Sequence, residues 1–472
     1  MWTQCNRTAL RFQRLGRRDV VAAFDGGHVT SDAGLLLLRE VANHIDLFPR
    51  LARCFRDQRD QRFVEHKLQH LLAQRVLAIA CGYEDLNDHD ALRTDPAFAL
   101  AVGRRDVEGT RRKGRDFGKP LAAHATLNRI ETAPAIGETH RRDQKIFHRP
   151  EDMEKLFVDM FIEQQDGVPE EIILDFDATD DPLYGQQEGR FFHGYYGAYC
   201  YLPLYVFAGE HLLVAKLRRS NQDAAAGSLE TLQCLVEQLR ARWPDVRIVV
   251  RADSGFCRDA LMTWCESQAG VDYVLGLAKN ARLKALLSPV MTDVAARAAA
   301  SGTSCRAYAE LRYRTLQTWS TERRVVGKAE QLGDKSNPRF VVTSLSPEEV
   351  DAKTLYADLY CARGDMENRI KEQQLGMFAD RTSSHTMRAN QLRLWFSSLA
   401  YVLVHALRRL ALAGTCLERA QVWTLRARLL KVGATLRVSV RRVTLSMASS
   451  FPLQDVFLLA HRRLRGLVGG HA

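Results

Sequence analysis

The sequence predicts an α/β fold built on a mixed sheet, with a helical region before it. At 472 residues the chain exceeds what one compact core holds, so we expect about three folded units. From about residue 168, apolar runs of strand length alternate with segments of helix length, a pattern typical of a mixed sheet covered by helices. The first 150 residues show helical patterning instead.

The composition is that of a globular protein with a polyanionic partner. Apolar residues make up 46% and charged residues 26%, and the formal charge of +11 favours nucleic acid, although a basic excess can also serve solubility alone. The ten cysteines show neither a C-x-x-C pair nor zinc-ligand spacing. A secretory signal and a membrane-length apolar run are both missing. We therefore expect a protein of the reducing bacterial cytoplasm, associated with the nucleoid when bound to DNA, and no membrane partner.

Residues 1–150 are expected to form a helical DNA-binding region. The apolar stretch 64–81 should be a helix that Gly82 ends. Residues 103–119 form a basic, glycine-rich loop that could follow a phosphate backbone, and a solvated loop without a ligand is the alternative. The cations of this loop that we expect to contact DNA are Arg111, Arg112 and Lys113.

Residues 165–280 should supply the first part of a mixed-sheet core. Residues 170–180, EEIILDFDATD, read as a strand, and residues 198–218 read as a hairpin that turns at Gly209 and Glu210. A helix at 224–242 then leads into the strand VRIVVRAD, and a helix from Arg258 leads into YVLGLAK. Strands that alternate with helices in this way favour a mixed sheet.

The remainder divides into three parts. Residues 281–350 are expected to form a β-rich insertion, in which Trp319 could stack on an unpaired base or pack in the core. Residues 351–412 should complete this core with a long helix at roughly 353–375, and residues 413–472 should form a basic C-terminal region.

Acidic residues stand at the ends of two predicted strands. Asp175 and Asp177 share one face of the strand IILDFD, and Asp253 closes the strand VRIVVRAD. If the two strands are neighbours, their carboxylates meet at one sheet edge and suit divalent metals, which take oxygen ligands. The alternative is that each aspartate caps the following turn.

A third group of polar residues lies on the long helix. Tyr360, Arg363 and Glu367 follow spacings of three and four and therefore share one helical face. Pairing of Arg363 with Glu367 within the helix is the simpler interpretation. The sequence has no Walker A loop, G-x-G-x-x-G, H-E-x-x-H or G-x-S-x-G motif, so nucleotide-driven and triad chemistry lose support.

With these residues the chain resembles the DDE transposases of bacterial insertion sequences, which carry a tyrosine-arginine-glutamate signature, and it looks close to their thirteen-eighty group. The resemblance spans most of the chain. The stretches that carry it are LDFDATDDPLYGQQ at 174–187, GYYGAYCYLPLYVF at 194–207, RADSGF at 251–256 and YCARGDMENRIKE at 360–372.

The resemblance implies an RNase H-like core that cleaves the ends of an element and transfers the strands into target DNA. It makes Asp177, Asp253 and Glu367 the catalytic acids that hold two Mg²⁺ ions, with Mn²⁺ as a substitute and Asp175 as the alternative first acid. The implied partners are double-stranded DNA at the inverted repeats of the element, target DNA, and a second copy of the chain in the synaptic complex.

The resemblance also assigns supporting residues. Tyr360 and Arg363 would hold phosphates near the cut, because arginine suits bidentate phosphate contacts. The signature expects a lysine seven residues after the glutamate, where this chain has Gln374, while Lys371 lies closer to the glutamate. Either residue could fill that supporting role, and Lys371 is our candidate for DNA contact.

Two other functions fit parts of the sequence. A related RNase H-like nuclease could use the same three acids to cut DNA without joining it. A DNA-binding protein derived from a transposase would need no catalysis, and the presence of all three acids speaks against it. Joined products from a labelled element end would separate the transposase from the nuclease.

Overall fold

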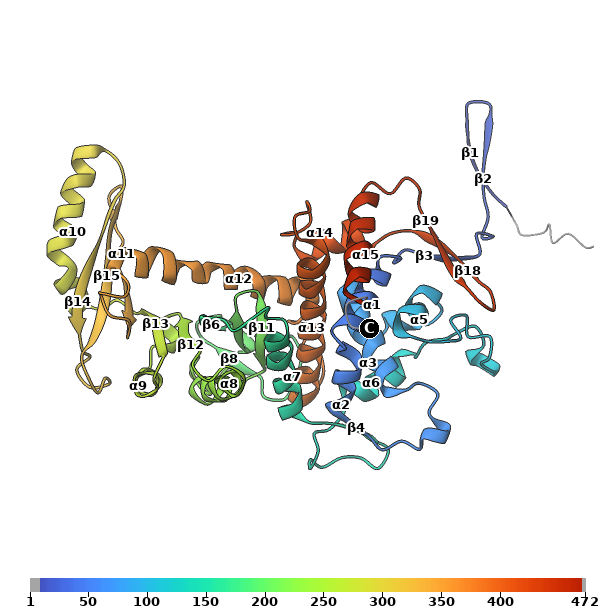
Figure 1. Ribbon diagram of the computed structural model, residues 1–472, viewed down its shortest axis with the longest axis horizontal. Helices are drawn as coiled ribbons and strands as arrows, with labels where there is room; N and C mark the ends of the chain where they lie inside the picture. The colour runs from blue at the N-terminus through green and yellow to red at the C-terminus, as the bar shows by residue number, and fades with distance from the viewer. Residues whose placement is uncertain (1–8, 469–472) are drawn as a thin grey trace, which may run out of the picture. The chain divides into compact units, whose positions relative to one another are not determined.

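The structure is a computed structural model and describes residues 9–468 (Figure 1). Its chain forms two compact units. The first, here called the terminal unit, combines Met1–His148 with Leu399–Ala472, and the second, the central unit, is Arg149–Ser398. Residues 413–472, for which the sequence predicts a basic C-terminal region, belong to the same compact unit as the N-terminal part of the chain.

The terminal unit is mainly helical and is centred on a buried helix, α3. Nearly every side chain of α3 is buried, and the helix ends at Gly82, whose φ of 97° provides the left-handed stop expected from the sequence. The helices are α1 Leu35–His44, α2 Leu47–Arg53, α3 Leu68–Cys81, α4 Asp88–Leu92, α5 Pro96–Val102, α6 His124–Glu131, α14 Val422–Leu425 and α15 Gln454–Val468.

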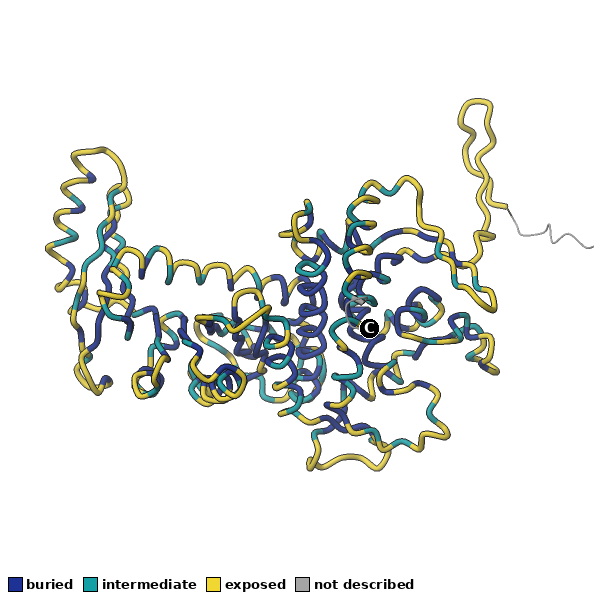
Figure 2. The backbone as a smooth tube through the Cα atoms, in the orientation of Figure 1, coloured by how far each residue is buried: buried dark blue, intermediate teal, exposed yellow. Residues whose placement is uncertain are grey.

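Short strands tie the two ends of the chain together in this unit. Strand β3 (His28–Thr30) pairs with β18 (Ala434–Val438), which also pairs with β19 (Val443–Met447). Lys431 Nζ lies 2.6 Å from the buried carboxylate of Asp32. The hairpin of β1 (Leu10–Leu15) and β2 (Arg18–Ala22) is exposed along its whole length (Figure 2).

The central unit is built on one large mixed sheet. Its strand order is β11-β10-β6-β12-β13-β17-β15-β14, with β16 beside β15. Strand β12 is parallel to both β6 and β13, whereas β10 and β11 are antiparallel neighbours, so the predicted hairpin at 198–218 is confirmed in its second half. The strands are β6 Glu171–Ala178, β10 Leu204–Ala208, β11 His211–Lys216, β12 Arg247–Ala252, β13 Val271–Leu277, β14 Cys305–Tyr313, β15 Arg323–Leu332, β16 Lys335–Ser336 and β17 Arg339–Thr343.

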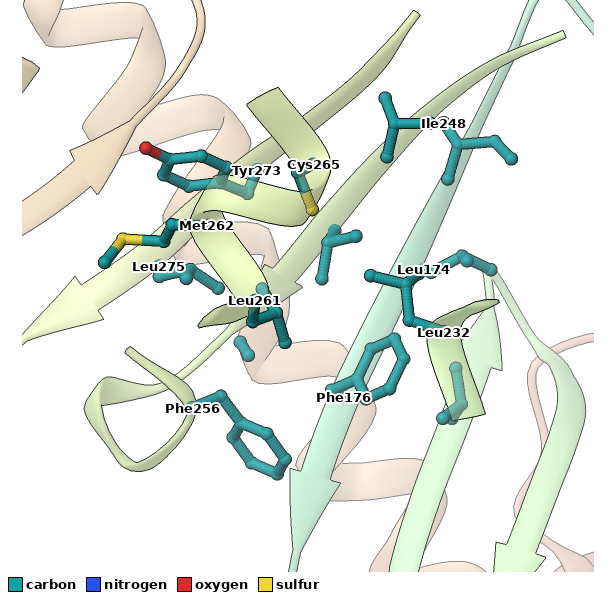
Figure 3. Close-up of a cluster of buried hydrophobic side chains, with 14 of the residues drawn as sticks. Leu174, Phe176, Leu232, Ile248, Phe256, Leu261, Met262, Cys265, Tyr273 and Leu275 are labelled. Atoms are coloured by element: carbon teal, nitrogen blue, oxygen red, sulfur yellow. The ribbon is translucent and has the colours of Figure 1, made fainter. Parts of the chain in front are cut away.

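Helices cover the sheet and close its main core (Figure 3). Leu174 and Phe176 of β6 pack with Leu232 of α8 and with Leu261 and Met262 of α9, and all five are buried. Burial of each such side chain stabilises the fold by about 1.5–3 kcal/mol. The helices of this unit that surround the core are α7 Pro150–Glu163, α8 Ser228–Arg242, α9 Asp259–Ser267 and α10 Ala281–Ser301.

The segment 281–350 differs from the β-rich insertion that the sequence predicts. It opens with the 21-residue helix α10, and its long strands β14, β15 and β17 extend the central sheet because β17 pairs with β13. Trp319 is only 5% exposed and packs edge-on against Tyr313, with the Arg323 guanidinium over its ring. Its ring therefore lies in the core, which favours packing over base stacking.

The remaining elements of the central unit are a small sheet and a run of helical segments. A small sheet joins β7 (Asp181–Pro182), β8 (Phe191–His193) and β9 (Ala198–Tyr201). The predicted long helix is a run of helical segments, here called the signature helix. It comprises α11 Ala352–Thr354, a π-helical stretch Leu355–Tyr360, a 3₁₀ turn Cys361–Arg363, α12 Gly364–Lys371 and a second π-helical stretch Glu372–Gly376.

One more helix completes the described residues. Helix α13, Met387–Leu407, contains the point between Ser398 and Leu399 where the chain passes from one unit to the other. Within residues 9–468, every helix falls short of the length or apolar character that a membrane crossing requires. No disulfide joins cysteines of this part of the chain, and Cys5 lies outside it.

Candidate active site

Two aspartates leave the sheet at the same edge. Asp177 is the penultimate residue of β6, and Asp253 directly follows β12. The two strands are parallel neighbours, and each aspartate comes one residue after the paired positions Phe176 and Ala252. The prediction that these strands are neighbours is confirmed, and the two carboxylates therefore start from adjacent positions on one edge.

Arg363 links the first aspartate to the signature helix. Its Nη2 lies 2.9 Å from Asp177 Oδ2, and its Nη1 lies 3.2 Å from Glu367 Oε1. The pairing of Arg363 with Glu367 within the helix, the simpler interpretation of the sequence, is thus present, but the same guanidinium also reaches the sheet edge. Through it, Asp177 and Glu367 come to the same place although 190 residues separate them in the chain.

Asp177 is a buried carboxyl with two acidic neighbours, Asp253 and Glu367. The pKa of its carboxyl is raised to about 6, mainly by burial, which the Arg363 guanidinium opposes, and to a lesser extent by the charges of Asp253 and Glu367. One arginine therefore does not neutralise the three acids. An additional cation would stabilise the ionised form of Asp177.

Asp253 partly fulfils the capping role that the sequence left open. Its Oδ1 accepts a hydrogen bond of 2.8 Å from the backbone N–H of Gly255 and so caps the short turn after β12. A carboxylate has two oxygens with several lone pairs. Capping by Oδ1 is therefore compatible with a second interaction at the sheet edge.

Asp175, the alternative first acid, has a structural partner. It is 1% exposed, and Arg251 on the neighbouring strand binds both its oxygens, at 2.5 and 2.7 Å. Arg251 also donates to the backbone carbonyl of Leu359, in the signature helix just before Tyr360. The pair of Asp175 and Arg251 thus anchors the helix that carries Arg363 and Glu367, which leaves Asp177 as the better candidate for the first acid.

Tyr360 packs against a glycine of the sheet. A Cβ atom at Gly276, on β13, would lie 2.5 Å from the Tyr360 hydroxyl oxygen and 2.9 Å from the backbone nitrogen of Ser254. A side chain at position 276 would therefore push on the signature helix and on the backbone next to Asp253. Sequence reasoning missed both Gly276 and Arg251, because their roles depend on strand register.

Replacement of Gly276 by Ala is expected to reduce DNA cleavage at least about tenfold and to cost about 1–3 kcal/mol of stability, because overpacking displaces backbone near Asp253. A cleavage assay and a denaturation curve would measure the two effects. Adding Tyr360→Phe should recover part of the stability, since it removes one of the two clashes. Gly167→Ala is the control, because a Cβ there meets open space; an equal loss in that variant would contradict the prediction.

The position of the expected signature lysine is held by Gln374. Its amide donates to the Asp180 carbonyl at 3.0 Å and to Asp181 Oδ1 at 2.8 Å. Asp181 is fully buried, and burial raises the pKa of its carboxyl to about 8. A neutral glutamine suits a carboxyl that is protonated at neutral pH. Lys371, our candidate for DNA contact, is exposed on α12.

The predicted contacts of the basic loop differ among themselves. Arg112 is buried, and its guanidinium lies 2.6 Å from Glu65 and bonds the backbone carbonyl of Lys119. Arg111 and Lys113 are exposed. Arg112 therefore supports the loop, whereas its two neighbours are available to a ligand.

The three candidate acids suit a divalent metal by their chemistry. All are carboxylates, the ligands that Mg²⁺ prefers, and their mutual repulsion at Asp177 calls for a cation. With Arg363 between them, the described residues hold no group of three His, Cys, Asp or Glu side chains placed to bind one metal ion. A metal would thus take over part of the charge compensation that Arg363 supplies here.

Comparisons with known proteins complete the description. No curated protein matches the chain. Among solved structures, the chain is similar to piggyBac transposase in a synaptic complex with hairpin DNA, with a TM-score of 0.39 and 11% identity, over 85% of this chain and 80% of that chain. Residues 12–468 match the family described as Transposase DDE domain group 1, so the chain belongs to the DDE transposases.

Proposed function

We propose that this DDE transposase cleaves DNA at the ends of an insertion sequence and joins the free ends to target DNA. The observation that carries the proposal is the convergence of Asp177, Asp253 and the pair of Arg363 and Glu367 at one sheet edge. The strand arrangement around β6 and β12, with acids at adjacent strand ends, supports an RNase H-like core.

Asp177, Asp253 and Glu367 are the residues that would hold two Mg²⁺ ions, for which Mn²⁺ could substitute. Bound there, the metals would supply the activation of water or of a 3′-hydroxyl and the stabilisation of the leaving oxygen. The protein itself supplies placement. Arg363, released in part from its acids, can give a bidentate contact to a DNA phosphate, and Tyr360 fixes the helix against the sheet at Gly276.

The partners in this proposal follow from the resemblance of the sequence to the transposases of bacterial insertion sequences. The chain would bind the inverted repeats of a bacterial insertion sequence of the thirteen-eighty group, then target DNA, as a homodimer that holds two element ends together. Such a protein acts in the bacterial cytoplasm on the nucleoid. The basic excess of +11 supports contact with polyanionic DNA.

The test uses a labelled duplex copied from the DNA that flanks the coding sequence, incubated with the full chain and a target plasmid. We expect nicks at the element end and labelled joined products with Mg²⁺ or Mn²⁺, and neither in chelator. Cleavage without joined products would favour the nuclease over the transposase. Sequence-specific binding without cleavage would favour a non-catalytic DNA-binding protein.

A further inference from the structure

A large pocket in the terminal unit lies far along the chain from the candidate acids. It has a volume of about 900 Å³, and its walls come from the basic loop and from the segment before α3. Six cations and three acids line it. The cations are Lys67, Arg104, Arg105, Arg111, Arg112 and Lys113, and the acids are Glu65, Asp106 and Asp116.

The three carboxylates of this pocket already make ion pairs or hydrogen bonds within the protein. Glu65 pairs with Arg112, and Asp116 pairs with Arg93 at 2.8 Å. Asp106 accepts hydrogen bonds from the backbone N–H groups of Thr110 and Arg111 and so fixes the turn of the loop. These carboxylates therefore stabilise the residues that form the pocket.

Four of the cations are left without such partners. Lys67, Arg105, Arg111 and Lys113 are all exposed, and within residues 9–468 none of their side chains makes an ion pair or a hydrogen bond. They line the same pocket as Arg112, whose contacts with Glu65 and with the Lys119 carbonyl hold the basic loop in place. The pocket thus presents uncompensated positive charge on a fixed framework.

The pKa values of His70, which lines the pocket, and of His66, which lies next to the lining residues Glu65 and Lys67 in the chain, are lowered by burial and by the same cations. The pKa of His66 is lowered to about 3 and that of His70 to about 4, first by burial and then by nearby cations, Arg112 and Arg104 for His66 and Arg104 and Lys67 for His70. Burial and Arg112 also lower the pKa of Arg104. Crowded cations repel further positive charge and attract an anion.

We propose that this pocket binds a short stretch of the DNA sugar-phosphate backbone, with Lys67, Arg105, Arg111 and Lys113 as the contacts and Arg112 as their support. This inference rests on the proposed function, which makes DNA the anionic partner. The volume suits several backbone groups better than a single inorganic ion.

The residues that line the pocket are unsuited to recognising the base sequence of DNA. Apart from His70, it has no aromatic ring on which a base could stack. Contacts to phosphates set position and affinity but carry no sequence information. The pocket should therefore strengthen binding to all duplex DNA equally, and recognition of an element end must come from other residues.

The test measures binding of the full chain to a labelled random duplex of about 30 base pairs over a range of salt concentrations. In the variant Arg105→Gln, Arg111→Gln, Lys113→Gln, we expect weaker binding at low salt and a salt slope that is smaller by about 3. Between low and physiological salt, the variant should therefore lose about threefold less affinity per removed contact than the parent chain. The variant Arg105→Lys, Arg111→Lys keeps the charge at all three positions and should keep the slope.

The matched control removes the same charge elsewhere in the terminal unit, at the exposed residues Arg53, Arg56 and Arg62. An unchanged slope in the pocket variant, or an equal loss in the control, overturns the inference. Tight binding of inorganic pyrophosphate that leaves DNA binding undisturbed would also overturn it and indicate a site for a free phosphate.

Failure of the pocket and failure of the proposed function give different results. If the pocket variant binds DNA like the parent chain while Asp253→Asn abolishes cleavage, the pocket inference falls and the transposase function stands. If Asp253→Asn still cleaves, the proposed active site falls whatever the pocket variant does. A drop in affinity that is equal for element-end and random duplex supports the backbone contact.

Discussion

Single replacements of Asp177 by Asn, Asp253 by Asn and Glu367 by Gln are each expected to reduce cleavage at an element end at least about a thousandfold. Metal assistance is worth several kcal/mol of barrier, and about 1.4 kcal/mol corresponds to a factor of ten in rate. DNA binding should be unchanged or tighter, because removal of an acid lessens repulsion of phosphate. Cleavage of a labelled duplex and anisotropy on the same variants measure both effects.

The control for these variants is Asp365→Asn. Asp365 lies on α12, two residues before Glu367, and is exposed, so it tests the loss of an acid on the same helix. We expect it to cleave at close to the parental rate. A fully active Glu367→Gln chain, or undiminished cleavage in chelator, would show that the metal assignment is incorrect.

Replacement of Asp175 and replacement of Asp177 by Asn should change the free energy of unfolding of the metal-free protein in opposite directions. Asp175→Asn leaves the buried Arg251 guanidinium without its carboxylate, which should cost about 3–5 kcal/mol. Asp177→Asn should stabilise the metal-free protein at neutral pH by up to about 3 kcal/mol, since a folded-state pKa of about 6 exceeds the ordinary value of 3.8. Urea denaturation in chelator would compare the two.

The stabilisation expected for Asp177→Asn should also depend on pH in a defined direction. Between pH 3.8 and about 6, the Asp177 carboxyl ionises in the unfolded chain while it stays protonated in the folded one. The parent chain should therefore lose stability relative to Asp177→Asn as the pH rises through this window. The advantage of the variant should be absent below it and complete above it. Equal stability changes for both variants, or an advantage only at low pH, would contradict this account.

The strands nearest the site could be predicted from the sequence because each is a short apolar run with a clear end. β6, β12 and β13, and the turn at Gly209, all lie where periodicity and turn residues indicate them. Their acids could be proposed as a group because each closes such a run. The length of the signature helix was likewise evident from its pattern at 353–375.

What the sequence could not provide is register and long-range pairing. The roles of Arg251 and Gly276 depend on which residues of adjacent strands lie opposite each other. The same holds for β17 beside β13, which turns the expected insertion into an extension of the sheet. Arg112 and its neighbours look alike in the sequence, and only the position of Glu65 separates the buried residue from the exposed ones.

The terminal unit has a consequence for how this protein can be divided. Its two segments are joined by backbone hydrogen bonds, which Ala33 donates to the Val432 carbonyl and Gly34 to the Leu430 carbonyl. They pack so closely that a Cβ at Gly34 would overlap the Leu429 carbonyl. A polypeptide that stops at residue 148 would expose this seam as unsatisfied backbone and bare apolar surface. The smallest piece able to carry the basic pocket in its native form is therefore discontinuous: it needs residues 9–148 together with residues 399–468, whereas the central unit is an insertion between them.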